Sequence, residues 1–579
     1  MPFGYHGSYF RIDVSRPSSE QVPLSEKVLR QFIGGSGLGV KLLLDEGAAV
    51  LDPLSPNAPL VFAFSPLVGS PLTTSAKFAV VSKSPLTDRI NDSLASSGFA
   101  VAGKACGCDA MMIVGRAPEL SVLIVEGTTE GPRVRLESAG EYRGATCRET
   151  EARLKARLGA HYRVASIGPA GENNVRYATI SHDGRHAGRG GSGAVLGAKN
   201  IKAIAICGSM RTEWSDPDQL TALSKSLSQR SFGPATAKYR ELGTATNLLT
   251  FNRLSALPTR NFQSGTFEEA INLSPEQLAS VRPKTRKSCV ACTIGCEHIY
   301  SNGESNVRVE YESLFALGSL CGVGDSDAVL RASQRCDELG LDTISTGGTI
   351  AFAMECVSRG WLDEPWLTFG SSDALLRAIE LIGSRKGLGD LLAEGSRRAA
   401  LAFGHDSIAI APQVKGLEIP GYEPRALQTM ALGFAVGARG ADHNRSGAYE
   451  VDFSDKVDRR RVTLDAVHHA IETEDKAALM DSLILCKFLR GVFVDFHAEA
   501  AEMLRCVTGW DVTADELRET ARRIVSAKRQ FNLLAGWTLD EDTLPARFLN
   551  TPLPSDPEAC LSREHLDALV TEYHRQRGW

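Results

Sequence analysis

The hydrophobic pattern of the chain changes near residue 210, and this change constrains the fold more than any other feature of the sequence. Before it, short apolar runs rich in Val, Ile and Phe alternate with Gly, Pro, Ser and Asn. Runs of five to eight such residues favour strands over helices. They lie at 59–67, 77–85, 110–115, 120–127, 177–184 and 201–208. We therefore expect residues 1–208 to form a β-rich domain.

After about residue 212 the apolar residues recur at helical spacing, with Gly near the ends of several segments. The segment at 215–227 opens with a Ser/Asp cap signal. The expected helices lie at 215–227, 325–340, 374–387, 388–404, 463–489 and 514–532. The chain is thus predicted to have an α+β fold, with sheets in its N-terminal part and helices in its C-terminal part.

Composition excludes several classes of protein. The 579 residues are 43% hydrophobic and 23% charged, which is ordinary for a globular chain and excludes disordered, collagen-like and disulfide-scaffold proteins. A net charge of −5 gives no reason to expect nucleic acid as the main partner. Neither a signal-peptide-like stretch nor a run of about 20 apolar residues is present. We expect a cytoplasmic protein without membrane contact, whose thiols stay reduced.

Three cysteines form the strongest local chemical signal, Cys289-x2-Cys292-x3-Cys296. Three thiolates within eight residues suit a zinc ion or an iron–sulfur cluster. The spacing is not a common zinc-finger pattern, whereas a four-iron cluster can take its last thiolate from a distant segment. Spacing leaves six candidates for that ligand, which are Cys321, Cys336, Cys356, Cys486, Cys506 and Cys560.

The segment 182–206 combines many glycines with Arg185 and Arg189 and leads into an apolar run. Successive glycine amides can approach an anion closely, and arginine binds phosphate oxygens in a bidentate manner. The segment lacks the GKS or GKT of an ATP-type phosphate loop. A simple turn between strands explains the glycines equally well, and the same holds for the second glycine-rich match at 34–39.

Acidic residues mark two similar segments in the helical part, DELGLD at 337–342 and DSLILC at 481–486. Each lies near the end of a predicted helix, where acids are often only solvated or capping. Glu310 and Glu312 flank Tyr311, and His443 lies among Arg and Asp residues. A lone histidine or glutamate is more often structural than catalytic, and no HExxH, GxSxG or kinase motif occurs.

The motifs together resemble those of the aldehyde:ferredoxin oxidoreductases, which are tungsten–bispterin enzymes. The matching stretches keep their order from residue 34 to residue 490. They are GGSGLG (34–39), DPLSPNAPLVFAFSPLVGSP (52–71), VSKSPLTDRINDS (81–93), IGPAGENNVRYATI (167–180), AGRGGSGAVLGAKNIKAIAI (187–206), ALPTRNF (256–262), CVACTIGC (289–296), GLDTIS (340–345), VKGLEIPGYEPR (414–425) and ARGADHNR (438–445). The resemblance implies a β-sheet saddle at 1–208 that carries the cofactor, with helical domains at 209–412 and 413–579.

The resemblance also assigns the cysteines and acids. It makes Cys289, Cys292 and Cys296 three ligands of a 4Fe–4S cluster and Cys486 the fourth. The two acidic segments match the family's paired pterin-binding motifs, D-x-x-G-L-C/D. The matching residues are Asp337, Gly340, Leu341 and Asp342 in the first, and Asp481 and Leu485 in the second. Ile484 stands in place of the second motif's glycine, which puts the backbone approach to that pterin in doubt.

Further residues are implied to hold the pterin phosphates and a magnesium ion that bridges them. The wall facing the phosphates is the segment with Arg185, Gly188, Arg189, Gly190 and Gly191. Asn91 matches a residue near the magnesium. Lys77 stands where family members tend to carry Arg, which replaces a planar fork by a point charge.

The implied activity is reversible oxidation of a small aldehyde to a carboxylic acid, with Glu312 and His443 acting beside tungsten or molybdenum. Glu310 competes with Glu312 for this role. Electrons would pass through the cluster to ferredoxin or an iron–sulfur subunit. A homodimer is possible, but residues 331–336 lack the E-x-x-H motif that binds an interfacial iron in some members. The rivals are a related reductase of an aromatic acyl thioester and a zinc-stabilised, non-catalytic protein.

Overall fold

Two six-stranded mixed sheets form the N-terminal part of the chain. The structure, a computed structural model, describes residues 2–301, 303 and 305–579. The first sheet contains β1 (Ser8–Asp13), β2 (Ser18–Pro23), β3 (Leu60–Ala63), β4 (Lys77–Lys83), β5 (Ile90–Ser96) and β6 (Ala110–Val114), in the order β2-β1-β6-β3-β4-β5. The second contains β7 (Ser121–Thr128), β8 (Gly131–Ser138), β9 (Arg163–Ser166), β10 (Ile180–His182), β11 (Arg185–Ala187) and β12 (Ile201–Gly208), in the order β11-β10-β9-β12-β7-β8. Each of the six predicted runs contains a strand, and the α+β fold is confirmed.

An apolar cluster joins the two sheets. It contains Phe62 and Phe78 from the first sheet and Ile204 from the second, all buried. Phe99, on helix α3 (Gly98–Ala105), packs its ring 5.8 Å from that of Phe62 and 5.2 Å from that of Phe78. Burial of such aromatic side chains is a main source of core stability. The sheets therefore form one packed unit, on which the rest of the chain is assembled.

The glycine-rich stretch at 34–39 is not a simple turn. It opens helix α2 (Gly35–Asp45), which lies on the first sheet. A Cβ atom on Gly39 would lie 2.4 Å from the Val81 side chain, so glycine permits the close contact between helix and strand. The turn interpretation of this stretch was wrong because these glycines are needed for packing, which local composition does not reveal.

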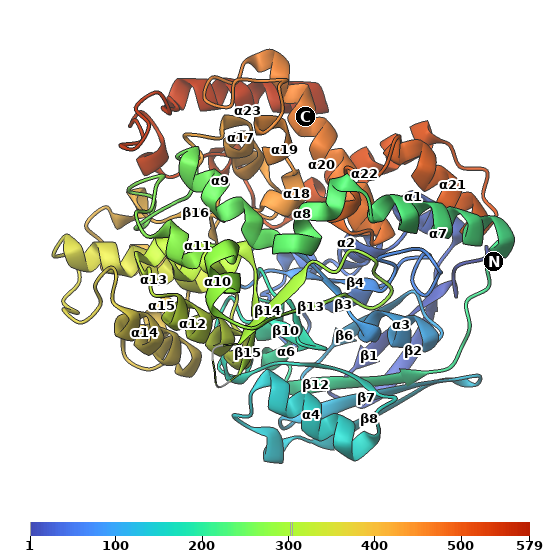
Figure 1. Cartoon of the computed structure of the whole chain (residues 1–579). Helices are drawn as coiled ribbons and strands as arrows, with labels where there is room; N and C mark the ends of the chain where they lie inside the picture. Colours follow the sequence, from blue (N-terminus) through green and yellow to red (C-terminus); the bar gives the residue numbers. More distant parts are fainter. Residues whose placement is uncertain (1, 302, 304) are drawn as a thin grey trace.

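Helices form most of the chain after residue 212, and they cover the sheets from above and from one side in the view of Figure 1. The main ones are α7 (Pro217–Ser231), α8 (Pro234–Leu242), α11 (Tyr311–Leu317), α12 (Ser326–Leu339), α13 (Thr343–Ser358), α14 (Ser372–Ser384), α17 (Gln428–Val436), α20 (Val467–Leu483), α21 (Phe496–Thr508), α22 (Ala514–Leu534) and α23 (Arg563–Arg577). The helices expected at 215–227, 325–340, 374–387 and 514–532 are confirmed.

Two of the expected helices have different bounds. The segment 388–404 forms two helices, α15 (Leu388–Leu392) and α16 (Ser396–Phe403), separated at Gly395. The segment 463–489 contains α20, which ends at Leu483 because Ile484 adopts a left-handed conformation. No single helix in the described part of the chain is long and apolar enough to cross a membrane, although residues 311–321 and α12, bent by 120°, pass that test as a pair.

A small antiparallel sheet within the helical part was not predicted. It consists of β13 (Lys284–Lys287), β14 (Glu297–Ser301) and β15 (Asn306–Val309). The cysteine triplet lies in the loop between β13 and β14. Because β13 reads Lys-Thr-Arg-Lys, it shows none of the apolar alternation by which strands are recognised. The sheet fixes both ends of the cysteine loop.

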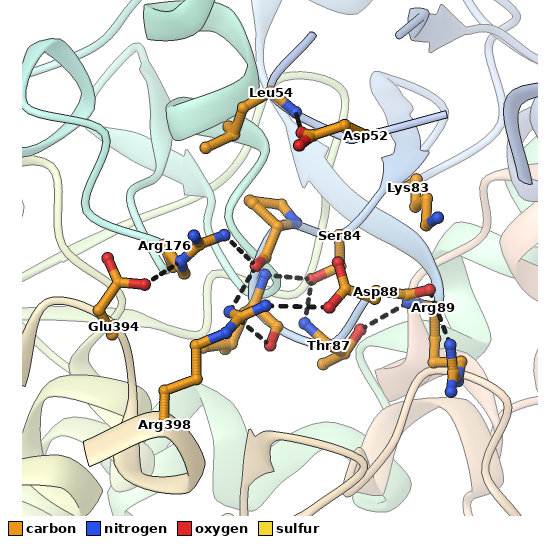
Figure 2. A network of polar contacts seen from close by, with 12 residues as sticks. Asp52, Leu54, Lys83, Ser84, Thr87, Asp88, Arg89, Arg176, Glu394 and Arg398 are labelled. Carbon is orange, nitrogen blue, oxygen red and sulfur yellow. Dashed lines mark hydrogen bonds and ion pairs between the residues drawn. The ribbon is translucent and has the colours of Figure 1, made fainter. Parts of the chain in front are cut away.

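The turn between β4 and β5 connects the N-terminal sheets to the C-terminal helices through polar contacts (Figure 2). Arg398, on α16, donates to the Pro85 carbonyl at 2.8 Å and forms an ion pair with Asp88 at 2.9 Å. Arg176 donates to the same carbonyl at 2.9 Å. Ser84 donates its hydroxyl to the Gly190 carbonyl at 2.9 Å. The turn thus contacts both the glycine–arginine segment and helix α16.

Candidate functional site

The structure brings Cys486 to the cysteine triplet. All four cysteines are free and partly buried, and three of them pack against the same apolar cluster, which includes Leu483 and Leu485. Neighbouring thiols interact, since Cys486 raises the pKa of Cys296 further after burial has raised it. Of the other candidates for the fourth ligand, Cys321, Cys336 and Cys356 are buried in the core of the helical part, Cys506 is buried on α21, and Cys560 is exposed.

The four thiols form a donor set from two segments of the chain, and among the described residues no three of their sulfurs lie within 4.8 Å of one another. Thiolate sets of this kind bind a zinc ion or an iron–sulfur cluster.

Lys77 lies between this cysteine set and the second acidic segment. Burial by itself would lower the pKa of its ammonium group, but the thiols of Cys486 and Cys289 and the carboxylate of Asp481 raise that pKa overall. The cation is therefore held by the negative groups on both sides of it. A lysine here provides one charge without the fork of an arginine.

The two acidic segments form equivalent turns at helix ends. Gly340 ends α12 with φ +76°, and Ile484 ends α20 with φ +65°. The amide of Leu341 donates to Cys336 O at 2.8 Å, and that of Leu485 donates to Met480 O at 2.9 Å. The second turn therefore has the backbone conformation of the first, with isoleucine at the position of glycine.

The acids of these turns differ in their surroundings. Asp337 lies 3.1 Å from His186 Nε2 and 3.8 Å from Arg308 Nη2. Asp342 caps α13 by accepting the amide of Ser345 at 3.1 Å. Asp481 is fully buried. Lys487 Nζ lies 2.8 Å and Arg445 Nη1 3.4 Å from its oxygens, yet neither oxygen accepts a hydrogen bond.

The glycine–arginine segment lines the interior beside Asn91. Gly190 has φ +92°, and a Cβ there would lie 2.0 Å from Asn91 Oδ1. Gly188 precedes it after β11, and Gly191 caps α6 (Ser192–Ala198). The Arg189 guanidinium is buried and donates to the Glu418 carbonyl. Arg185 points elsewhere, since it pairs with Glu297 and its charge acts on the Cys289 thiol. The structure thus places Arg185 beside the cysteines, away from Arg189.

Several buried polar atoms in this interior have no hydrogen-bond partner within the described residues. They are Asn91 Oδ1, Arg189 Nε and Nη1, Glu312 Oε1, Arg439 Nε and His443 Nδ1. Folded proteins leave few such groups unpaired, because each costs roughly 1–3 kcal/mol. Their mixture of acceptors and cationic donors fits a cofactor with ring N–H groups and phosphate oxygens.

Arg439 belongs to this set, although sequence reasoning did not single it out. Its guanidinium donates to Asp92 O at 3.0 Å and pairs with Asp442 at 3.0 Å. Burial lowers its pKa to about 10, and the nearby Arg445 lowers it as well. The only sequence signal was its presence in the quoted stretch ARGADHNR.

Glu312 and His443 face each other in the interior. Glu312, on α11, places Oε1 3.5 Å from His443 Nε2 and accepts the Gly421 amide at 3.1 Å through Oε2. Burial raises the pKa of Glu312 to about 8. Burial, with the added charge of Arg189, lowers the pKa of His443 to about 3. Near neutral pH the pair therefore holds a protonated acid beside a neutral imidazole.

Glu310 does not share this environment. It caps α11 at the surface, where its side chain is 44% exposed and pairs with Arg308 at 3.4 Å. Although Tyr311 lies between the two acids in sequence, only Glu312 faces inward. The geometry therefore favours Glu312 over Glu310 as the acid of the pair.

Aromatic rings lead from the surface to this pair. Tyr422 stacks on His443 with ring centroids 5.0 Å apart, and Phe251 lies 5.3 Å from Tyr422. Phe453, stacked on Phe251 at 5.1 Å, is 40% exposed. Tyr449 lies 6.1 Å from His443 and 5.1 Å from Tyr422. The pair therefore has an apolar, aromatic wall along one side.

The described residues thus hold a set of four thiols and a buried acid–base pair, a combination that suits a redox enzyme. Models of the aldehyde ferredoxin oxidoreductase family match residues 9–208 (N-terminal domain) and 222–579 (domains 2 and 3). The chain therefore belongs to the aldehyde ferredoxin oxidoreductase family, and it is an oxidoreductase.

Individual relatives agree with this assignment. The tungsten-containing aldehyde ferredoxin oxidoreductase of Pyrococcus furiosus is 36% identical, over 100% of this chain and 96% of its own. The WOR-like subunit of aliphatic sulfonate oxidoreductase from the same organism is 30% identical, over 100% of this chain and 95% of its own. A solved structure, the active site complex BamBC of benzoyl coenzyme A reductase with 1,5-dienoyl-CoA, shares the fold. It has a TM-score of 0.84 and 22% identity, and the match covers 100% of this chain and 95% of that one.

Proposed function

We propose that the chain oxidises an aldehyde to a carboxylic acid, reversibly, and passes the electrons to ferredoxin or an iron–sulfur subunit. The reaction converts R–CHO and water into R–COOH, two protons and two electrons. The observation that carries the proposal is the Glu312–His443 pair, whose oxygen and nitrogen lie 3.5 Å apart in a buried site. Family membership supports the same reaction class.

The residues present fit a tungsten bis-pterin and a 4Fe–4S cluster. Asp337, Asp342 and Asp481 would accept ring N–H groups, while Arg189, Arg439 and the Gly190 backbone would face phosphates with a bridging magnesium near Asn91. Cys289, Cys292, Cys296 and Cys486 would hold the cluster. When bound, these groups supply two-electron oxidation and the release of single electrons. Pterin sulfurs bind tungsten and molybdenum alike, so the residues of this chain do not select between the two metals.

The acid–base work falls to the pair itself. Protonated Glu312 is able to donate to the aldehyde oxygen, and neutral His443 is able to accept a proton from the attacking water. Two titratable groups whose environments separate their pKa values in this way are suited to act as acid and base at one pH. Tyr422 keeps the imidazole ring in place by stacking on it.

The aromatic wall indicates the substrate class within this function. Phe251, Tyr422 and Phe453 offer large flat apolar surfaces between solvent and the pair. Such surfaces favour aldehydes with an aromatic or extended apolar group. A panel of aromatic, aliphatic and charged aldehydes tests this substrate class. Including an aromatic acyl thioester in the panel tests the alternative function as a reductase, which the shared fold alone supports.

A homodimer without the E-x-x-H iron remains a prediction.

The decisive experiment compares Glu312→Gln with Glu310→Gln, using an aldehyde and a viologen dye as acceptor. We expect Glu312→Gln to lower kcat by roughly 10²–10⁴-fold with tungsten and iron contents unchanged. Glu310→Gln should stay within about twofold of the native rate, since Glu310 faces solvent. A near-native rate for Glu312→Gln removes its assigned role.

The native pH profile provides a second readout. The reaction needs protonated Glu312, whose pKa is about 8, and neutral His443, whose pKa is about 3. The rate should therefore be level between these values and fall as the pH rises through about 8. In Glu312→Gln the fall on the alkaline side should disappear, because the amide does not titrate.

A further inference from the structure

A row of exposed cations lies directly beside the cysteine loop. Lys284, Arg286 and Lys287 on β13 are all exposed. Neighbouring cations have carboxylate partners, since Arg282 pairs with Asp327 and Arg185 with Glu297. Within the described residues the three β13 cations have no such partner, and Lys284 donates only to a backbone carbonyl, Glu241 O, at 3.0 Å. Their charge is therefore directed to solvent.

The strand carrying these cations has a free edge. The small sheet has the order β13-β14-β15, so β13 pairs on one side only, with β14. The one acid opposite the row is Glu297, across from Lys287, and it already pairs with Arg185. The positive charge on this edge is therefore not neutralised by the sheet itself.

The row continues into the loop that holds the thiols. Ser288 alone separates Lys287 from Cys289, and the next two residues form an exposed apolar tip, in which Val290 is 47% exposed. The Ala291 carbonyl accepts the Thr74 amide at 2.6 Å, and this bond anchors the tip to the segment that precedes β4. A partner resting on this tip would stand over the cysteine set.

A cation on α8 extends the face on its far side. The bond from Lys284 to Glu241 O joins β13 to the end of α8. Lys238 on α8 is exposed and lies 5.0 Å above the Tyr239 ring, which stacks on Phe488 at 4.1 Å. Phe488 follows Cys486 by two residues. Positive charge and apolar surface thus border the thiols from both contributing segments.

We propose that this docking face (Lys238, Lys284, Arg286, Lys287, Val290 and Ala291) binds an acidic ferredoxin for electron transfer. The inference rests on the proposed function and names where its partner binds. Because the chain has a net charge of −5, its overall charge repels an acidic protein. A local positive face on such a chain attracts and orients an acidic partner at one place. Each aldehyde oxidised releases two electrons, so two one-electron clusters of oxidised ferredoxin are reduced in turn.

Charged residues on an edge strand have a simpler role as well, which is to prevent strand pairing between molecules. That role requires exposed charge of either sign and no particular partner. It predicts that reversing the charges leaves electron transfer unchanged. The two interpretations therefore differ in a measurable way.

The test uses the full-length holoenzyme with Lys284→Glu, Arg286→Glu and Lys287→Glu combined. The acceptors are a viologen dye and an acidic two-cluster ferredoxin, each at low and high salt. The matched control reverses three exposed cations on other elements, Arg148→Glu, Lys386→Glu and Arg563→Glu. It makes the same change in net charge away from the docking face. A neutral triple, with Gln at positions 284, 286 and 287, provides a milder change.

We expect the docking-face triple to lower kcat/KM for ferredoxin by about tenfold or more at low salt, with the dye rate within about twofold. The native salt dependence should largely disappear, and the neutral triple should fall between. An unchanged ferredoxin rate, or an equal loss in the control triple, overturns the proposal. Absence of aldehyde-dependent dye reduction in the native protein would instead refute the proposed function, so the two failures are distinguishable.

Discussion

The turns at 337–342 and 481–486 share a backbone and differ in almost every side-chain environment. Both end a helix with a residue at positive φ and repeat the same backbone hydrogen bond. The first has glycine there and ends in an aspartate that caps α13. The second has isoleucine and ends in Cys486, next to the thiol set. Backbone geometry is therefore common to both turns, while side chains give each its own role.

The difference at the positive-φ position has a physical explanation. A β-branched residue rarely adopts this conformation, which costs roughly 1–2 kcal/mol. Ile484 is almost fully buried, and its side chain fills the space above Gly35, where an added Cβ would lie 2.5 Å from Ile484 Cδ1. Burying such a side chain contributes about 1.5–3 kcal/mol, which offsets the strain. At Gly340 an added Cβ would lie 3.0 Å from the Gly168 amide, so a side chain there would be crowded by the backbone.

The largest expected effect separates the last residues of the two turns. Cys486→Ser should reduce iron content and abolish or alter the cluster's EPR signal, with loss of nearly all activity, because serine is a poor cluster ligand. Asp342→Ser is the matched change, since serine still caps α13. It should leave the EPR signal unchanged. An unaltered signal in Cys486→Ser means that the fourth ligand lies elsewhere.

A smaller effect separates the first acids. Asp481→Asn leaves Lys487 and Arg445 without their buried counter-charge and should lower the free energy of unfolding by roughly 3–5 kcal/mol. Asp337→Asn should cost about 1 kcal/mol, because the Asp337 side chain is 29% exposed. Urea unfolding of both variants measures the difference. Equal losses would show that the two acids are held alike.

The smallest effect tests the strain at Ile484. Ile484→Ala loses the packing and keeps the strain, whereas Ile484→Gly loses the packing and relieves it. The glycine variant should therefore be more stable than the alanine variant by about 1 kcal/mol, which is the reverse of the order inside a helix. Thermal unfolding of the two variants decides the order. If alanine is the more stable, the turn carries no strain.

Sequence patterns predicted much of the fold and less of the site. Apolar runs located six of the twelve strands in the two large sheets, and helical spacing located α7, α12, α14 and α22. The strand β13 was missed because its four residues are all polar. The early end of α20 was missed because nothing in the sequence marks Ile484 as left-handed. The domain division at residue 412 stays a prediction.

For the site, spacing identified the cysteine triplet but left six choices for its partner, since contacts between distant segments are not encoded in local pattern. Resemblance selected Cys486, which the structure brings to the triplet. Arg439 and the unpaired interior atoms could not be foreseen, because burial and the lack of a partner are properties of the folded chain. The opposite pKa shifts of Glu312 and His443 likewise arise from burial.

Metal analysis of the purified protein tests the central claim most directly, namely that the interior holds a tungsten bis-pterin beside a four-iron cluster. Elemental mass spectrometry should find about one tungsten, or molybdenum, and about four irons per chain. Cys486→Ser should lose iron while zinc stays near background. Zinc at about one per chain, with neither tungsten nor molybdenum, would contradict the account.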